Sequence, residues 1–250
     1  MRATLPLLAG VVAGSILTGA LGASDSDCAD CHRANPDLPS YAHIADWADS
    51  IHGRERVGCE SCHGGDPNTF QQFLAHRDIL HPEDPDSPLH PTRLASTCGV
   101  CHGAILSAFE DSSHGRLIRQ GDVQVPGCIS CHGPVAAQGL GPNGLQVACS
   151  RCHDADARWP EPEVSIGGAA LAVYREAERQ LKKVRNRVRK VKEGALAHEL
   201  EAGVIDVAAT LDEAIEAGHA MDLDTMLEES RAAQATLDGL FEALKQRRRR

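Results

Sequence analysis

The pattern Cys-x-x-Cys-His occurs five times in this chain of 250 residues, and the five copies use all ten of its cysteines. A zinc ribbon or a disulfide framework would not need a histidine at one fixed offset from every cysteine pair. The same spacing attaches haem, because the two thiols add across the two vinyl groups and the next histidine binds the iron from one face. The sequence therefore predicts five covalently bound haem c groups and five iron atoms.

Each predicted site combines two haem-binding cysteines with one proximal iron ligand. The haem-binding cysteines are Cys28, Cys31, Cys59, Cys62, Cys98, Cys101, Cys128, Cys131, Cys149 and Cys152, and the proximal ligands are His32, His63, His102, His132 and His153. No Ser-His-Asp set, nucleotide-binding loop or pair of carboxylates stands out elsewhere in the chain. We therefore predict no catalytic residue.

The second axial ligand of each iron separates electron carriage from catalysis. A haem with both axial positions filled by the protein changes redox state, whereas an open position can bind a substrate. Outside the motifs the chain has eight histidines, and beyond the initiator it has two methionines. A second histidine is therefore available for all five haems. Since a methionine ligand raises the redox potential, ligation by histidine alone indicates low potentials.

Two of the eight histidines have the same surroundings. His52 and His114 each lie in a Ser-x-His-Gly segment with one attachment motif upstream and another downstream, which suggests a duplicated two-haem unit. Both are predicted distal ligands. The other predicted distal ligands are His43, His76, His81 and His90, the last three in the acidic, proline-rich segment 64–97.

Two further histidines, His198 and His219, continue apolar stripes of predicted helices. Facing inward, each could reach a haem edge, although a histidine satisfied within the core is the commoner outcome at such positions. The sequence leaves their ligation open.

Aromatic residues make up only 3% of the chain, too few to dominate an ordinary core of this size. Five haems attached within residues 24–159 would supply large, flat apolar bodies to that part of the chain. We expect the haems to form its core, with short helices at the attachment sites and long loops between them. The predicted fold class is all-α.

The composition and periodicity of the sequence change near residue 160. After this point cysteine and proline give way to apolar residues at spacings of three or four. The apolar stripes run over residues 170–195, 204–215 and 223–244, and the predicted breaks are Gly203 and Gly218. We predict a pentahaem domain over residues 24–160. A helical domain over residues 161–250 follows, built as an antiparallel hairpin or bundle with a basic tail.

Residues 1–23 have the features of a secretory signal: a charged start at Arg2, an apolar stretch and a small-residue exit. We expect cleavage and a periplasmic or otherwise exported protein, with a retained anchor, and so membrane association, as the less favoured alternative. Residues 24–159 hold nine arginines, no lysine and 18 acidic residues, a net charge of −9. Basic redox proteins are thus better partners for this part than nucleic acid.

The segment Arg179–Lys192 contains eight basic residues and no acidic residue. A solvated helix face is the simpler interpretation. The alternative is a docking surface for an acidic partner, such as the haem domain of a neighbouring copy, or for lipid phosphates.

The motifs resemble those of multihaem c-type cytochromes of the cytochrome c554 kind, over residues 28–153. The resemblance rests on the five attachment motifs, three of them followed by glycine, and on the two Ser-x-His-Gly segments. It implies haems in closely stacked or perpendicular pairs that pass electrons along a chain. The related pentahaem nitrite reductases typically carry a Cys-x-x-Cys-Lys motif at the catalytic haem, and this sequence has none. The resemblance therefore favours an electron-transfer protein.

Three functional hypotheses follow. The first is an exported pentahaem cytochrome that relays electrons between respiratory partners. The second is a small oxidoreductase that acts on an inorganic nitrogen or sulfur compound at a five-coordinate haem. The third is a structural subunit of a cytochrome complex or filament, which associates through the C-terminal helices.

Overall fold

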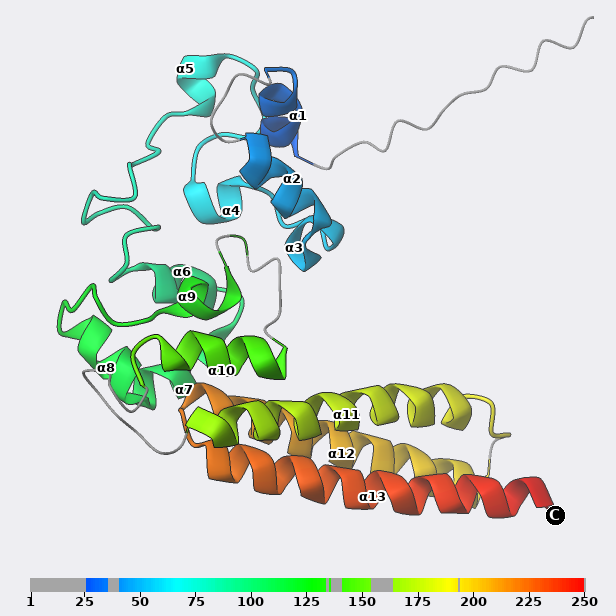
Figure 1. Ribbon diagram of the computed structural model, residues 1–250. Helices are drawn as coiled ribbons and strands as arrows, with labels where there is room; N and C mark the ends of the chain where they lie inside the picture. The colour runs from blue at the N-terminus through cyan, green and yellow to red at the C-terminus, as the bar shows by residue number, and fades with distance from the viewer. Residues whose placement is uncertain are drawn as a thin grey trace, which may run out of the picture.

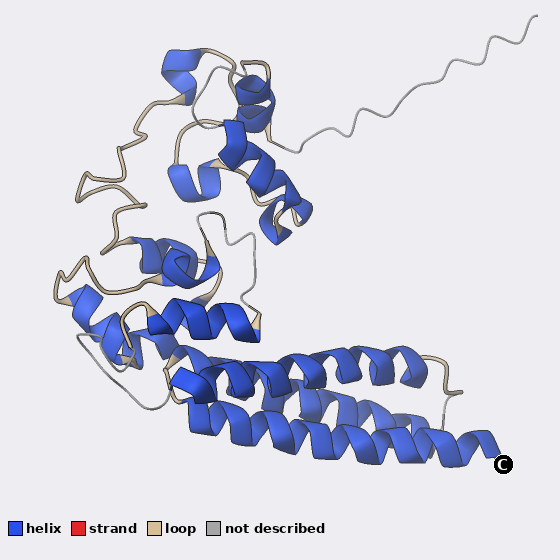
Figure 2. Cartoon of the chain, in the orientation of Figure 1, coloured by secondary structure: helices blue, strands red, loops and turns tan. Residues whose placement is uncertain are grey.

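The computed structural model describes residues 26–35, 41–133, 135, 141–153, 164–192 and 194–249. Within these residues the chain forms helices and loops and no strand (Figure 2). Short helices come first and three long, packed helices follow (Figure 1), so the predicted all-α class is confirmed. The predicted signal segment 1–23 and the predicted domain boundary near residue 160 lie outside the described residues.

The first five helices form what we call the N-terminal lobe. They are α1 (Asp27–Arg33), α2 (Tyr41–Asp49), α3 (Ile51–Arg54), α4 (Glu60–His63) and α5 (Gln72–Ala75). The buried apolar cluster of this lobe is small and consists of Ala29, Ile44 and Trp47. The indole nitrogen of Trp47 donates a hydrogen bond to the carbonyl oxygen of Val57 at 2.9 Å, which ties α2 to the loop before α4. Few apolar side chains thus hold this lobe together.

The next five helices form the second lobe, below the first in Figure 1. They are α6 (Leu94–Gly99), α7 (Gly103–Asp111), α8 (Ser113–Arg119), α9 (Cys128–His132) and α10 (Pro142–Ser150). A loop over residues 76–93 connects the lobes. This loop has local order, because Arg93 donates hydrogen bonds to the Pro85 carbonyl and to Asp86, and Ser87 is fully buried.

Both Ser-x-His-Gly segments form the same corner between two helices. Buried Ser50 donates a hydrogen bond to the Trp47 carbonyl at 2.7 Å and accepts one from the Gly53 amide at 3.1 Å, capping α3. Ser112 makes the corresponding bonds at 2.6 and 3.0 Å between α7 and α8. A Cβ atom on either glycine would collide with a carbonyl oxygen of the preceding helix, so glycine is required there. The repeated sequence therefore encodes a repeated helix corner.

The long helices α11 (Val164–Val188), α12 (Ala195–His219) and α13 (Leu223–Arg249) form an antiparallel three-helix bundle. Their apolar stripes meet along the bundle axis, as the periodicity predicts. The buried residues of this core are Ala177, Leu181, Val184, Val188, Leu200, Val204, Val207, Leu211, Ala233, Leu237 and Leu244. None of the described helices is both long enough and apolar enough to cross a membrane.

The first helix break of the bundle differs from the predicted one. The chain leaves α11 after Val188 and starts α12 at Ala195, with Gly194 before it at φ 145°, a value that side chains rarely permit. Gly203 instead lies inside α12, where its bare surface lets Leu240 of α13 approach. His198 consequently belongs to the start of the second long helix and does not continue the first.

The bundle packs against the second lobe. Helix α10 lies on α11, and α7 lies on α12. A small cluster of Ala170, Leu171 and Met226 seals this end of the bundle, with Leu145 of α10 packed against it. Within the described residues, no helix of the N-terminal lobe makes an extensive contact with either the second lobe or the bundle.

Candidate haem-binding sites

All five attachment motifs lie on or directly after a short helix, namely α1, α4, α6, α9 and α10. In such a turn the two cysteines and the histidine occupy positions i, i+3 and i+4, which share one helix face. The His63 amide, for example, donates to the Cys59 carbonyl at 2.9 Å, and the His153 amide donates to the Cys149 carbonyl at 2.9 Å. The local helix therefore presents both thiols and the imidazole to one side. None of the ten cysteines forms a disulfide.

Every motif histidine faces a second histidine ring from elsewhere in the chain. The ring centres are 5.8 Å apart for His32 and His76, 6.1 Å for His63 and His43, 6.2 Å for His102 and His52, 6.1 Å for His132 and His219, and 5.9 Å for His153 and His114. We call the second member of each pair the partner histidine. Five motifs thus acquire five different partners, which no spacing along the sequence could have assigned.

These separations fit an iron atom between two imidazoles. Two metal–nitrogen bonds of about 2 Å each, on opposite sides of one ion, place the centres of the two rings roughly 6 Å apart. Cysteines and histidines at these positions therefore match the donor set of a covalently attached, bis-histidine haem.

Hydrogen bonds orient three of the partner histidines. A backbone carbonyl oxygen lies 2.7 to 3.2 Å from the Nδ1 atom in each case: Ile215 for His219, Gln72 for His76, and Val135 for His52. Because a carbonyl can only accept, Nδ1 must carry the proton and donate. The other ring nitrogen, Nε2, then keeps its lone pair for a metal, which is the usual arrangement around metal-bound histidine.

Burial also keeps two of the motif imidazoles in the neutral form that binds metals. Burial lowers the pKa of His63, and the neighbouring His43 and His32 lower it further. The pKa of His132 is lowered by burial and next by His219. Both rings are therefore uncharged near pH 7, so no proton competes for the metal-binding nitrogen.

The first ring pair lies beside a shallow hollow of about 520 Å³. His76 lines it together with Phe73, whose side chain is 84% exposed. Gln72, Arg77 and Asp78 complete the lining, so Phe73 supplies the aromatic surface beside His76 against which a haem face could pack.

The structure pairs four of the six predicted distal ligands, His43, His52, His76 and His114, with motif histidines. The other two, His81 and His90, form no ring contact with a motif histidine within the described residues. His90 Nδ1 is 2.8 Å from Thr92 Oγ1, and the side chain of His81 is 75% exposed. Their ligation stays a prediction without geometric support.

His219 is the partner histidine that the sequence left open. It is the last residue of α12, and its ring lies nearly parallel to that of His132, at an interplanar angle of 7°. Its position at the end of an apolar stripe gave a signal, but a helix stripe alone does not say what lies beyond the helix end. His198, at the opposite end of α12, is exposed.

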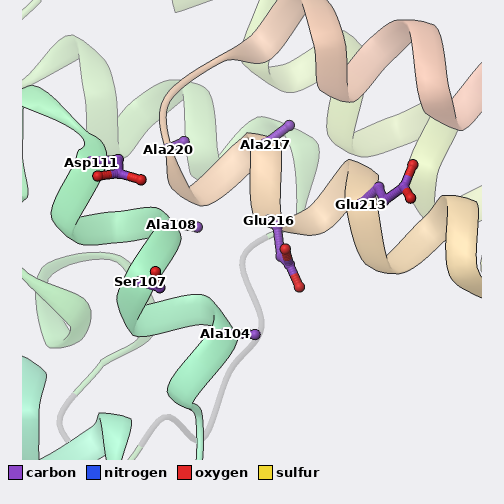
Figure 3. A pocket seen from close by; sticks show the side chains of 8 residues that line it. All are labelled: Ala104, Ser107, Ala108, Asp111, Glu213, Glu216, Ala217 and Ala220. Carbon is purple, nitrogen blue, oxygen red and sulfur yellow. The ribbon is translucent and has the colours of Figure 1, made fainter.

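An open groove of about 450 Å³ separates α7 from α12 (Figure 3). It is lined by Ala104, Ser107, Ala108 and Asp111 of α7 and by Glu213, Glu216, Ala217 and Ala220 of α12. None of the predicted haem-binding or iron-binding residues lines it. The alanines explain how the two helices approach each other.

Two family models match parts of this chain. The family "cytochrome c554 and c-prime" matches residues 16–64, which hold the first two motifs, and "cytochrome c7 and related cytochrome c" matches residues 85–154, which hold the other three. The predicted resemblance to cytochrome c554 is therefore supported over a shorter stretch than expected. The gap between the two matches, residues 65–84, covers α5 and the first part of the connecting loop.

One relative is the C-type polyheme cytochrome OmcC of Geobacter sulfurreducens, 26% identical over 144 residues. The aligned region covers 56% of this chain but only 16% of that protein. No solved structure matches the chain. The repeated attachment motifs, the two family matches and this relative together make the chain a multihaem c-type cytochrome that carries covalent haem c.

Proposed function

We propose that this protein is an exported electron carrier that holds five haems, each between two histidines, and passes electrons between redox proteins. One observation carries the proposal: every motif histidine lies opposite a partner histidine, with 5.8 to 6.2 Å between the two ring centres. The comparisons support the class of protein. The number of haems and their ligation are inferred from this geometry.

Bound haem supplies one-electron redox chemistry, while the polypeptide sets its position and potential. In the proposed arrangement the two cysteines of each motif would hold one haem, and the motif histidine and its partner histidine would both bind its iron. A substrate would then find no open position. This favours electron carriage over an oxidoreductase acting on a nitrogen or sulfur compound. Two histidines at each iron, in place of a histidine and a methionine, favour low potentials.

The proposed partners are redox proteins with basic docking surfaces. Residues 24–159 carry a net charge of −9, to which each haem would add its propionates. Opposite charge steers transient encounters and raises the association rate at low ionic strength. Electron exchange with a basic partner should therefore slow as salt is added.

Low-temperature paramagnetic resonance of the oxidised, matured protein tests the ligation directly. We expect low-spin iron at all five sites, no high-spin signal, and an absorption spectrum that cyanide and nitrite leave unchanged. Mass spectrometry should find the polypeptide heavier by five haems. A high-spin fraction that binds cyanide would favour the oxidoreductase, and a smaller mass gain would contradict the number of sites.

A further inference from the structure

Among the described residues, the helices of the two lobes have little contact with each other. Within the described residues no helix of α1–α5 packs extensively on a helix of α6–α10, and no ion pair joins the two groups. The loop over residues 76–93 connects them covalently (Figure 1). Something other than helix packing must fix the N-terminal lobe on the rest of the molecule.

One ring pair crosses from lobe to lobe. His52 belongs to α3 of the N-terminal lobe, and His102 directly precedes α7 of the second lobe, with their ring centres 6.2 Å apart. The first and second ring pairs lie on the N-terminal side of the molecule or at the start of the loop. The fifth lies within the second lobe, and the fourth joins that lobe to the bundle through His219.

The surroundings of His52 support this crossing point. Its Nδ1 donates to the carbonyl oxygen of Val135, a residue 83 positions further along the chain. The side chain of Val135 in turn packs against the Ala29, Ile44 and Trp47 cluster of the N-terminal lobe.

We infer that the third haem site is the bridge that holds the two lobes together, with one axial ligand from each lobe. This inference rests on the proposed bis-histidine ligation. An iron bonded to His52 and His102 joins positions 50 residues apart and closes the gap that helix packing leaves open. It also places the electron path between the lobes at this site.

A comparison of His52→Ala with His43→Ala tests the bridge. His43 lies on α2, the helix before α3 in the same lobe, but faces His63 of its own lobe. Both variants should gain one high-spin haem out of five. Only His52→Ala should increase the radius of gyration in X-ray scattering and speed tryptic cleavage at Arg77 and Arg93, in the connecting loop, by about tenfold.

Added imidazole separates ligation from bridging. It should return the iron to the low-spin state in both variants, yet the His52→Ala protein should stay expanded, because free imidazole is not attached to the N-terminal lobe. His52→Met controls for the lost hydrogen bond to Val135. A methionine can still bind the iron, so this variant should remain compact with a raised potential at one haem.

Each outcome decides a different claim. If His52→Ala gains a high-spin haem but stays as compact and as protease-resistant as His43→Ala, the bridge is wrong while the proposed ligation stands. If His52→Met expands like the alanine variant, the hydrogen bond and not the iron joins the lobes, and the bridge is again wrong. If neither alanine variant changes spin state, the proposed ligation itself fails.

Discussion

The C-terminal bundle and the two lobes differ in how far their apolar side chains are buried. The bundle buries a continuous row of aliphatic side chains, among which Leu237 and Val184 are fully covered. In the lobes the exposed fraction reaches 70% for Phe70, 84% for Phe73 and 85% for Val100, the last inside an attachment motif. The bundle is thus stabilised by its own sequence, whereas the lobes expose apolar surface beside the places where haem attaches.

Helix length follows the same division. The lobe helices have four to nine residues, too few to be stable alone in water, whereas the bundle helices have 25 to 27 residues. From this contrast we expect the cofactor to act as the core of the lobes. The bundle needs no cofactor for its own packing, yet its His219 lies opposite the motif histidine His132.

The largest expected effect is the loss of protection from hydrogen exchange in the lobes when the protein is made without haem. Protein produced in a host without cytochrome maturation should keep slow hydrogen exchange in α11, α12 and α13, while amides in α1–α10 exchange at nearly the rate of an unfolded chain. Mass-spectrometric hydrogen exchange measures both regions in one sample. Protection of the lobe helices in the haem-free chain would contradict the division.

The second effect is on the bundle itself. Leu237→Ala removes a fully buried side chain from the aliphatic core and should lower the free energy of unfolding by about 2 to 5 kcal/mol. Urea unfolding followed by far-ultraviolet circular dichroism measures this loss. Ile205→Ala, on an exposed position of α12, should cost less than about 0.5 kcal/mol. Equal effects of the two changes would contradict the packing of the bundle.

The third effect concerns the point where the two regions meet. His219→Ala should convert one haem of five to the high-spin state and let it bind cyanide, because His132 alone would then hold that iron. His198→Ala, on the same helix but exposed and outside any ring pair, should leave the paramagnetic spectrum unchanged. An unaltered spectrum for the His219 variant would show that the bundle provides no ligand to that iron.

The smallest effect tests the helix corners of the lobes. Ser112→Ala removes the cap that holds α8 against α7 and should cost about 1 kcal/mol, within a range of about 0.5 to 2 kcal/mol. Ser113→Ala, at the exposed neighbouring position, should change stability by less than about 0.5 kcal/mol. Thermal unfolding followed at the haem absorption band compares the two, and a larger loss for Ser113 would contradict the capping role.

Much of the site was predictable because haem attachment is a local event. Two thiols and an imidazole within one helical turn form a complete covalent site, so the spacing alone identified the class of protein. The duplicated corner was also visible, since serine and glycine act there within four residues. The partner histidines were harder, because His76 and His81 look alike in sequence while only His76 faces a motif histidine.

The sequence by itself determined the five attachment motifs, the all-helical class and the three apolar stripes of the bundle, because each depends on residues within a few turns of one another. Only the tertiary structure decided which histidine faces which. The ends of α11 and α12, the pairing of His219 with His132, and the crossing from His52 to His102 all depend on how distant segments pack. A second axial ligand needs only to be near in space, and periodicity along the chain carries no information about that distance.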